Sequence, residues 1–407
     1  MFIASALSAI NSSAAVRMPP RTFHESTVSE EEARVVSEST HKALYSLLPE
    51  ETRRLQSANA NQNAILNVKM TKEEKAHIRD YNKNNDGSAE HGFKPALVGV
   101  SKEVDDFVGK NPTRRLGQNN IYDDPFEDGV FYLTSEGFTW SIVVNSEDAE
   151  GISVLLSGLS IPAGVKISAF NEHGAFDTDI QDRVEDGQVW TKTIPGYEAF
   201  LVFHYAGDAP QEAIDNLRFS VDKVGIYNPN PVDDDARGRK LGNCNWGPAE
   251  CTVDYKCCDP TSIDDTNSCD SQDSIFRNTH LTDLSNSHAK MKWWSGNWSY
   301  SCSAGLINNA DGRTLLLTAN HCIHHSNSNL ELFFSAKNDL CESNTNCSYD
   351  FTTADTIGMK TLASSAKSDF TLFEPNLPLP TNNAKTYVAL GWNTDPVSIG
   401  EKLFRVQ

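Results

Sequence analysis

Cysteine is confined to one part of this chain. The 407 residues contain nine cysteines, and all of them lie between Cys244 and Cys347. A cysteine-dense stretch of this kind is typical of a disulfide framework made in an oxidising compartment. Because nine is odd, one thiol is free, pairs with another chain or has lost its partner. We therefore predict a cysteine-free first half and a disulfide-bonded second half with different roles.

The charge balance excludes some kinds of partner. The chain has 35 Lys plus Arg against 55 Asp plus Glu, a formal net charge of −20. A nucleic-acid-binding surface needs a basic footprint, so we expect no nucleic-acid partner. No apolar run approaches the roughly 20 residues that span a bilayer, so we expect no membrane partner either.

The first residues resemble a secretion signal. An apolar stretch over Phe2–Ile10 is followed by small residues, and Ser12-Ser13-Ala14 is similar to a signal-peptidase site. We predict a signal peptide over residues 1–15 and a secreted, extracellular protein. Asn297 and Asn346 begin glycosylation sequons, which matter only for a chain secreted from a eukaryotic cell.

Two segments precede the cysteines. Residues 16–124 are predicted to be helical or irregular, with one helix after Ser29, ended by Pro49, and a second after Met70. Residues 125–228 show short apolar runs with turn signals about every ten residues, which predicts an antiparallel β-sandwich.

A linker over residues 229–240 follows. It is rich in proline, then acidic, then basic, and Arg237-Gly238-Arg239-Lys240 offers an exposed cleavage site to a trypsin-like protease. A plain solvated linker is the alternative. Because cysteine begins immediately afterwards, we predict that residues up to about Lys240 are a removable pro-region, with the sandwich as its pro-domain.

The stretch TLLLTANHC carries the first candidate for chemistry. His321 closely follows a strand of buried character, and a bridge between Cys302 and Cys322 would fix its loop. A general base needs such fixity, and it needs an acceptor for its second ring N–H. Asp369 precedes an alternating strand, Phe370–Phe373, and is a candidate for that acceptor.

The motifs CSAGLINN, TLLLTANHC and SDFTLFE together resemble the trypsin-like (chymotrypsin-fold) serine proteases, in particular their secreted lysyl-endopeptidase-like branch. The resemblance covers about residues 241–407. It implies a mainly β fold in which this segment forms the first β-barrel of a trypsin-like double barrel. It also implies that His321 is the general base, that Asp369 orients it, and that Cys302–Cys322 is the histidine-loop disulfide.

The resemblance further implies the biochemistry. The chain is expected to be the zymogen of a serine endopeptidase that acts on protein or peptide substrates, with cleavage after Lys or Arg, as a monomer with no cofactor and no metal. Among the cysteines, it implies that Cys244 bridges to the second barrel and that Cys251 pairs with Cys341. Local extras would be Cys257, Cys258, Cys269 and Cys347.

The sequence departs from the family in two places. Asn320 stands where Ala is commoner, and no Gly-Asp/Ser-Ser-Gly turn that would carry the nucleophile is present. Four serines lie near Asp369 or after it without the glycines that such a turn needs: Ser364, Ser365, Ser368 and Ser398. We therefore expect a C-terminally incomplete protease domain over residues 241–407 without activity of its own.

Two other interpretations compete. His321, Cys322, His324 and His325 are all metal-ligand types within five residues, but a cysteine in a disulfide cannot bind a metal and zinc ligands are usually spaced differently. The chain could instead be a non-catalytic pseudoprotease or a secreted binding or adhesion protein. A catalytic site that has lost its activity has no reason to keep both His321 and Asp369, so their presence counts against these non-catalytic alternatives.

Overall fold

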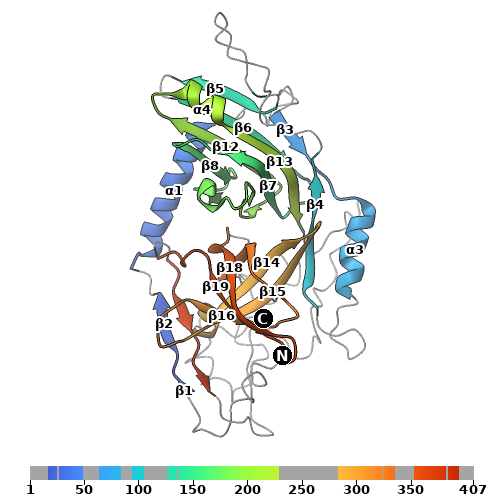
Figure 1. The fold of residues 1–407 in the computed structure, drawn as a ribbon, viewed down its shortest axis with the longest axis vertical. Coiled ribbons are helices and arrows are strands. Elements are labelled where there is room, and N and C mark those ends of the chain that lie inside the picture. The colour runs from blue at the N-terminus through green and yellow to red at the C-terminus, as the bar shows by residue number, and fades with distance from the viewer. Residues whose placement is uncertain are drawn as a thin grey trace, which may run out of the picture.

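The structure is a computed structural model in which most regular elements are β-strands (Figure 1). It describes residues 17–24, 27–48, 64–83, 94–104, 126, 128–134, 137–228, 283–323, 325–334, 353–381 and 384–393. The prediction of a mainly β chain is confirmed, and helices are few among the described residues. The predicted signal peptide, the linker and seven of the nine cysteines lie outside the described residues.

The second part of the chain forms a closed β-barrel. Its strands are β14 (His288–Ser295), β15 (Trp298–Ile307), β16 (Leu315–Thr318), β17 (Asn327–Phe334), β18 (Thr356–Ser365) and β19 (Phe370–Pro375). They pair in the order β15-β14-β17-β18-β19-β16, and β16 returns to pair with β15. Met291, Leu306, Leu332 and Phe373 belong to the buried apolar cluster of this barrel. The double barrel of the trypsin-like fold stays a prediction.

The first part, here called the N-terminal unit (residues 27–228), contains two sheets. One sheet has β3 (Ile65–Asn67), β5 (Val130–Thr134), β6 (Gly137–Asn145), β8 (Val165–Phe170), β9 (Phe176–Asp177) and β12 (Glu198–Ala206). The other has β4 (Ala96–Glu103), β7 (Gly151–Ser160), β10 (Val189–Trp190), β11 (Ile194–Pro195) and β13 (Arg218–Tyr227). Trp140 of β6, Val154 of β7 and Val224 of β13 share one buried cluster, so both sheets contribute to a common core. That this unit is a pro-domain stays a prediction.

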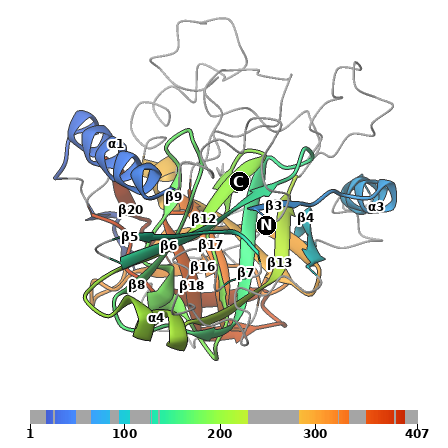
Figure 2. The same cartoon turned by 90° about the horizontal axis from the view of Figure 1, so that it is seen from above.

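Helices lie at the edge of this β structure. The main ones are α1 (Glu30–Leu47) and α3 (Lys72–Lys83), which Figure 2 shows on opposite sides of the molecule; α4 (Pro210–Asn216) and the 3-10 turn η3 (Ile180–Arg183) are short. The helix α1 begins after Ser29, as predicted, and Ser29 and Glu32 form a capping box at its start. Leu44 and Leu48 pack on Val143 and Phe200, so α1 covers the outer face of the first sheet.

Strand β4 differs from expectation, because residues 16–124 were predicted to be helical or irregular. Its residues Leu97–Ser101 are buried without interruption, so they lack the polar alternation by which an antiparallel strand is recognised. A Cβ at Gly99 would lie 2.5 Å from the carbonyl oxygen of Ile226, so glycine is what allows β13 to approach.

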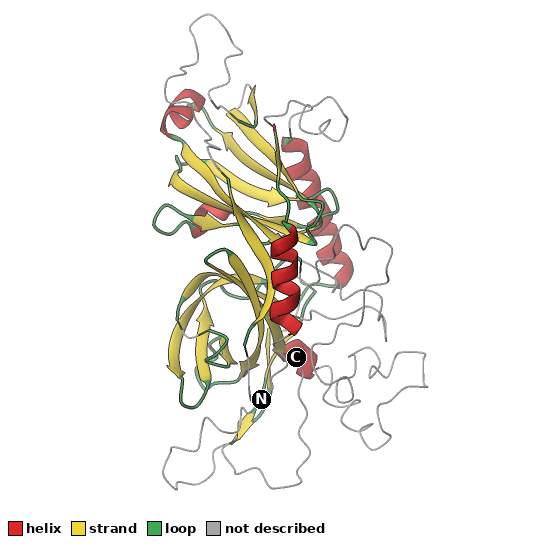
Figure 3. Cartoon of the chain, turned by 90° about the vertical axis from the view of Figure 1, so that its right-hand side faces the viewer, coloured by secondary structure: helices red, strands yellow, loops and turns green. Residues whose placement is uncertain are grey.

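This same strand joins the two parts of the molecule. One edge of β4 pairs with β13 of the N-terminal unit and the other with β15 of the barrel. The two β units are stacked along the long axis, with α3 beside their junction (Figure 3). The sheet therefore continues from one unit into the other, a continuity that no sequence pattern predicts.

A short N-terminal arm also contacts the barrel side. Its strands β1 (Arg17–Met18) and β2 (Arg21–His24) pair with β21 (Trp392–Asn393) and β20 (Tyr387–Ala389), respectively. The amide of Asn308 donates to the carbonyl oxygen of Pro19 at 2.8 Å. The first and last described segments of the chain therefore lie side by side.

Candidate active site

His321 lies three residues after the end of β16, in a loop fixed by the barrel. β16 pairs with β15 on one side and β19 on the other, so its backbone is held on both edges. The hydroxyl of Thr318 donates to the carbonyl oxygen of Ser303 on β15 at 2.7 Å. The turn then closes with the N–H of Cys322 donating to the carbonyl oxygen of Ala319.

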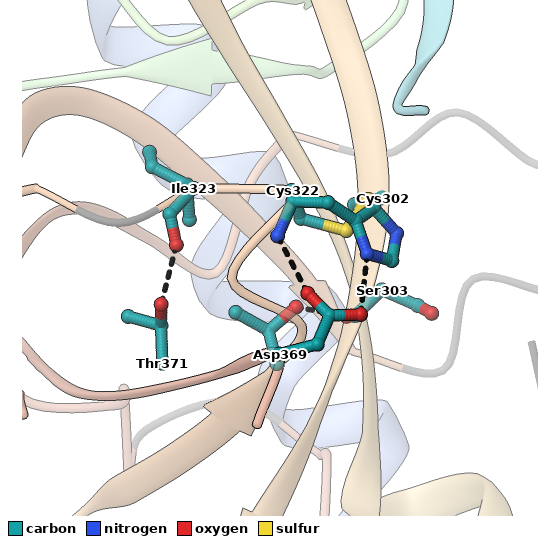
Figure 4. The surroundings of a disulfide bond; sticks show 8 residues. Cys302, Ser303, Cys322, Ile323, Asp369 and Thr371 are labelled. Carbon is teal, nitrogen blue, oxygen red and sulfur yellow. Dashed lines mark hydrogen bonds and ion pairs between the residues drawn. A yellow bond between two sulfur atoms is a disulfide. The ribbon is translucent and has the colours of Figure 1, made fainter. Parts of the chain in front are cut away.

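The predicted disulfide between Cys302 and Cys322 is confirmed. It joins β15 to the residue after His321, with the two Cα atoms 6.1 Å apart and 20 residues of sequence separation. Both half-cystines pack against the core of the barrel. The loop that carries His321 is therefore bonded covalently to a neighbouring strand (Figure 4).

Asp369 meets His321 because of strand pairing. β16 and β19 run antiparallel with Thr318 opposite Thr371, so the residues just after β16 lie beside the residues just before β19. One carboxylate oxygen of Asp369 lies 2.7 Å from Nδ1 of His321, and the other accepts the backbone N–H of His321 at 2.9 Å. The side chains of His321 and Asp369 are 29% and 40% exposed, so solvent reaches the pair.

The backbone and the charge of Asp369 are both adapted to this contact. Its φ of 48° is in the left-handed region, which aspartate tolerates better than most residues. Partial burial raises the pKa of the carboxyl, but hydrogen bonds from the backbone and ring of His321, its charge, and the backbone of Asn320 outweigh burial. The pKa of Asp369 is therefore below its ordinary value, and the group is a carboxylate at neutral pH.

Thr371 supports the site and was not predicted. Its buried hydroxyl donates to the carbonyl oxygen of Ile323 at 2.6 Å, just beyond the disulfide (Figure 4). The side-chain amide of Asn320 lies 3.4 Å from the same hydroxyl. The side chain of the unusual Asn320 thus contacts a supporting residue, while its backbone hydrogen-bonds to Asp369. Thr371 is an ordinary residue of an alternating strand, so nothing in the sequence marks it as a residue that supports the site.

A metal site does not fit these side chains. Ligand-type atoms of Cys302, His321 and Cys322 lie within 4.8 Å of one another. The two sulfurs are bonded to each other, however, so neither can be the thiolate that zinc requires. His325 is exposed, and His324 lies outside the described residues.

The candidate serines are placed in a hairpin. Ser364 and Ser365 end β18 opposite Thr371 and Phe370 of β19, and the N–H of Ser368 donates to the hydroxyl of Ser365. These contacts belong to the turn that leads into Asp369. Ser398 lies outside the described residues.

The comparisons relate this part of the chain to a protease family. Residues 249–406, less than half of the chain, match the family model of the lysyl endopeptidase C-terminal domain. No curated protein and no solved structure matches. The disulfide-fixed histidine, its aspartate and the barrel around them thus lie in a segment that is similar to the C-terminal domain of lysyl endopeptidase.

Proposed function

We propose that the chain is the precursor of a secreted serine endopeptidase similar to the lysyl endopeptidases. The observation that carries the proposal is the 2.7 Å contact between Nδ1 of His321 and Asp369 inside the segment that matches that family. A disulfide and three barrel strands position the pair. Such positioning is what general-base catalysis needs.

The proposed reaction is acyl transfer. With Nδ1 facing the carboxylate, Nε2 of His321 is the nitrogen that takes the proton of a serine hydroxyl as the serine oxygen attacks a peptide carbonyl. The imidazolium then gives this proton to the leaving amine, and the acyl-enzyme is hydrolysed by water. Asp369 keeps the ring in the correct tautomer and stabilises its positive charge.

The nucleophile is not proposed to come from these 407 residues. They contain no Gly-x-Ser-Gly turn, and Ser364, Ser365 and Ser368 are hairpin residues. The 407-residue chain should therefore have no turnover of its own. Protein or peptide is the proposed substrate, and cleavage after Lys or Arg rests on the family resemblance alone.

Residues up to about Lys240 are proposed to be removed when the enzyme matures. The basic stretch Arg237–Lys240 and the start of the cysteine-rich segment support this boundary. N-terminal sequencing of the mature secreted protein tests it. A mature start inside residues 125–228 would contradict it.

The proposal also includes secretion and excludes nucleic acid and membrane as partners. The Cys302–Cys322 disulfide and the signal-like residues 1–15 support an extracellular location. The net charge of −20 argues against nucleic acid as a partner. Within the described residues, no helix has the length and apolar character needed to cross a membrane. A monomer with no cofactor is proposed.

The decisive experiment examines the complete product of the gene. Its sequence is searched for a Gly-x-Ser-Gly turn, and the purified protein is assayed on Lys, Arg and Leu esters after labelling with a fluorophosphonate probe. We expect a labelled serine and turnover that is lost in a His321→Ala variant. A product with no labelled serine and no turnover would contradict the proposal and favour the non-catalytic pseudoprotease or binding protein.

The 407-residue chain provides a second arm of the same experiment. It should show no turnover with or without His321→Ala. Turnover that disappears in the His321→Ala variant would mean that a nucleophile lies within these residues, contrary to the proposal.

A further inference from the structure

The N-terminal unit completes an open edge of the barrel beside the candidate active site. On the edge away from β14, strand β15 pairs with β16 only over Gly305–Ile307, and Trp298–Ser301 pair with β4. Cys302 follows directly, and its sulfur lies within 4.8 Å of a ring nitrogen of His321. Strand edges are surfaces to which an extended chain adds. Here β4 is the strand that is added to the edge of β15.

A charged pair on the barrel is completed by the N-terminal unit. Lys292 on β14 and Glu331 on β17 lie opposite each other, with nitrogen and oxygen 2.5 Å apart and side chains 0% and 2% exposed. Thr193 of the N-terminal unit donates its backbone N–H to one carboxylate oxygen of Glu331 at 2.5 Å and its hydroxyl to the other at 2.8 Å. The ammonium of Lys292 also contacts the Thr193 hydroxyl. A buried ion pair is stable only when such hydrogen bonds satisfy its remaining lone pairs.

Apolar and aromatic contacts also join the N-terminal unit to the barrel. Trp190 stacks on Trp294 with ring centroids 5.0 Å apart and an interplanar angle of 12°. Ile78 of α3 belongs to a second buried cluster, against which Trp298 and Tyr300 of β15 pack. Strand pairing, a satisfied charge pair and aromatic packing are the features of an interface that binds without a covalent link.

We propose that the N-terminal unit stays bound to the barrel as a separate chain after the linker is cut, with β4 occupying the edge beside His321. In the described residues, the two parts contact each other only through non-covalent interactions: strand pairing, side-chain hydrogen bonds and aromatic stacking. A cut at residues 237–240 removes none of these contacts. Binding does not depend on the proposed function. With β4 at the edge beside His321, the bound unit should also inhibit the enzyme, and this second consequence rests on the proposed function because it requires that the barrel be part of a protease.

The binding test uses the full chain with a site-specific protease sequence in place of residues 234–240. After cleavage, two bands on a denaturing gel should elute together from a size-exclusion column at micromolar concentration. Hydrogen exchange at residues 298–301 should match that of the uncut chain, because β4 still pairs with them. Separation of the two pieces, or loss of this protection on cutting, would overturn the proposal.

A pair of variants tests the contact of Thr193 with the Lys292–Glu331 ion pair. Thr193→Val deletes the hydroxyl that contacts both Glu331 and Lys292 and should make the cut pieces dissociate about 10-fold faster or more, because a hydrogen bond to a buried charge is lost. Thr178→Val, in the same unit and partly buried, is the matched control and should leave dissociation unchanged. Equal dissociation rates for both variants would overturn the role of Thr193. If Thr193→Val does not fold uncut, Glu331→Gln replaces it with the same expectation.

The inhibitory arm uses the complete gene product. Cutting the linker should leave ester hydrolysis low, and Thr193→Val should release activity after the cut. Full activity of the cut wild-type pair while the pieces elute together would overturn inhibition by β4. A complete product that never turns over, with the pieces still bound, would reject the proposed function and leave the interface standing.

Discussion

At the scale of single residues, one carboxylate explains how the candidate site is organised. Asp369 adopts a left-handed backbone conformation and uses both oxygens on His321, one for the ring and one for the backbone N–H. The second bond ties the orientation of the carboxylate to the main chain of the loop that it serves. A carboxylate that is held in this way stabilises an imidazolium without moving, so it needs no reorganisation during proton transfer.

In an active form of the proposed endopeptidase, Asp369→Asn should reduce kcat by about 10⁴-fold. An amide in this place keeps the shape of the side chain but favours the wrong tautomer of His321 and gives no charge to stabilise the imidazolium. Steady-state kinetics on an ester substrate measure the effect. Asp311→Asn, in an exposed turn of the same barrel, is the control and should leave kcat unchanged. A loss below about tenfold for Asp369→Asn would contradict the proposed role.

At the scale of elements, the site depends on how three neighbouring strands are connected. β15 supplies Cys302, β16 leads to His321 and β19 begins after Asp369. Antiparallel pairing brings the last two together, and the disulfide adds the first. Part of this arrangement was predictable from the sequence, because the motifs mark His321, Asp369 and both half-cystines. Thr371 was not predictable, because its role depends on the carbonyl oxygen of Ile323, which lies 48 residues earlier in the chain.

Thr371→Val should lower the free energy of unfolding by about 1–3 kcal/mol, because it leaves the buried carbonyl oxygen of Ile323 without its donor. Urea unfolding of the 407-residue chain measures this. Thr361→Val on the neighbouring strand β18 is a matched control, since its buried hydroxyl finds no hydrogen-bond partner among the described residues. The control should change stability by less than about 1 kcal/mol. Equal losses in both variants would contradict the role given to Thr371.

Removing the Cys302–Cys322 disulfide should cost about 3 kcal/mol of stability, given a loop of 20 residues. The double variant Cys302→Ser with Cys322→Ser makes this change, and thermal unfolding measures it. In an active form of the proposed endopeptidase kcat should fall as well, because the His321 loop loses its covalent link to β15. Ser303→Ala, next to Cys302, is the control for the exchange of a neighbouring side chain. Unchanged melting and kcat in the double variant would show that the loop is rigid without the bridge.

At the scale of the whole molecule, the two β units are joined by more than the linker. β4 continues the sheet of the N-terminal unit into the barrel, and charged groups lie at the contact. Lys290 of the barrel donates to the hydroxyl of Tyr227 of the N-terminal unit at 2.8 Å. Burial lowers the pKa of Lys290 to about 8, with nearby Lys292 acting in the same direction and Glu150 opposing it.

This lowered pKa makes stability depend on pH in a defined direction. In the folded chain Lys290 loses its proton near pH 8, whereas in the unfolded chain it does so near 10.5. Between these values the unfolded state binds more protons, so stability rises with pH across this window, and the cost of burying the charge is fully present below pH 8. We expect a contribution of about 1–3 kcal/mol.

Lys290→Met should remove this contribution, because no charge is then buried at the contact. Urea unfolding of the wild type and of Lys290→Met at several pH values from 7 to about 10.5 measures the difference, since groups remote from Lys290 titrate alike in both chains. Lys367→Met, exposed in the hairpin before Asp369, is the control and should follow the wild type. A stability difference between wild type and Lys290→Met that does not change with pH would contradict the assignment.

The sequence by itself determined the features that depend on local patterns. Cysteine placement and the TANHC and SDFTLF motifs indicated the disulfide and the histidine–aspartate pair, and Ser29 marked the start of α1. Tertiary structure alone decided what lies on either side of β4 and what completes the Lys292–Glu331 pair. The physical reason is that strand pairing and the hydrogen bonds of buried charges join residues far apart in the chain. A buried strand such as β4 has no alternation, so its own residues do not specify its neighbours.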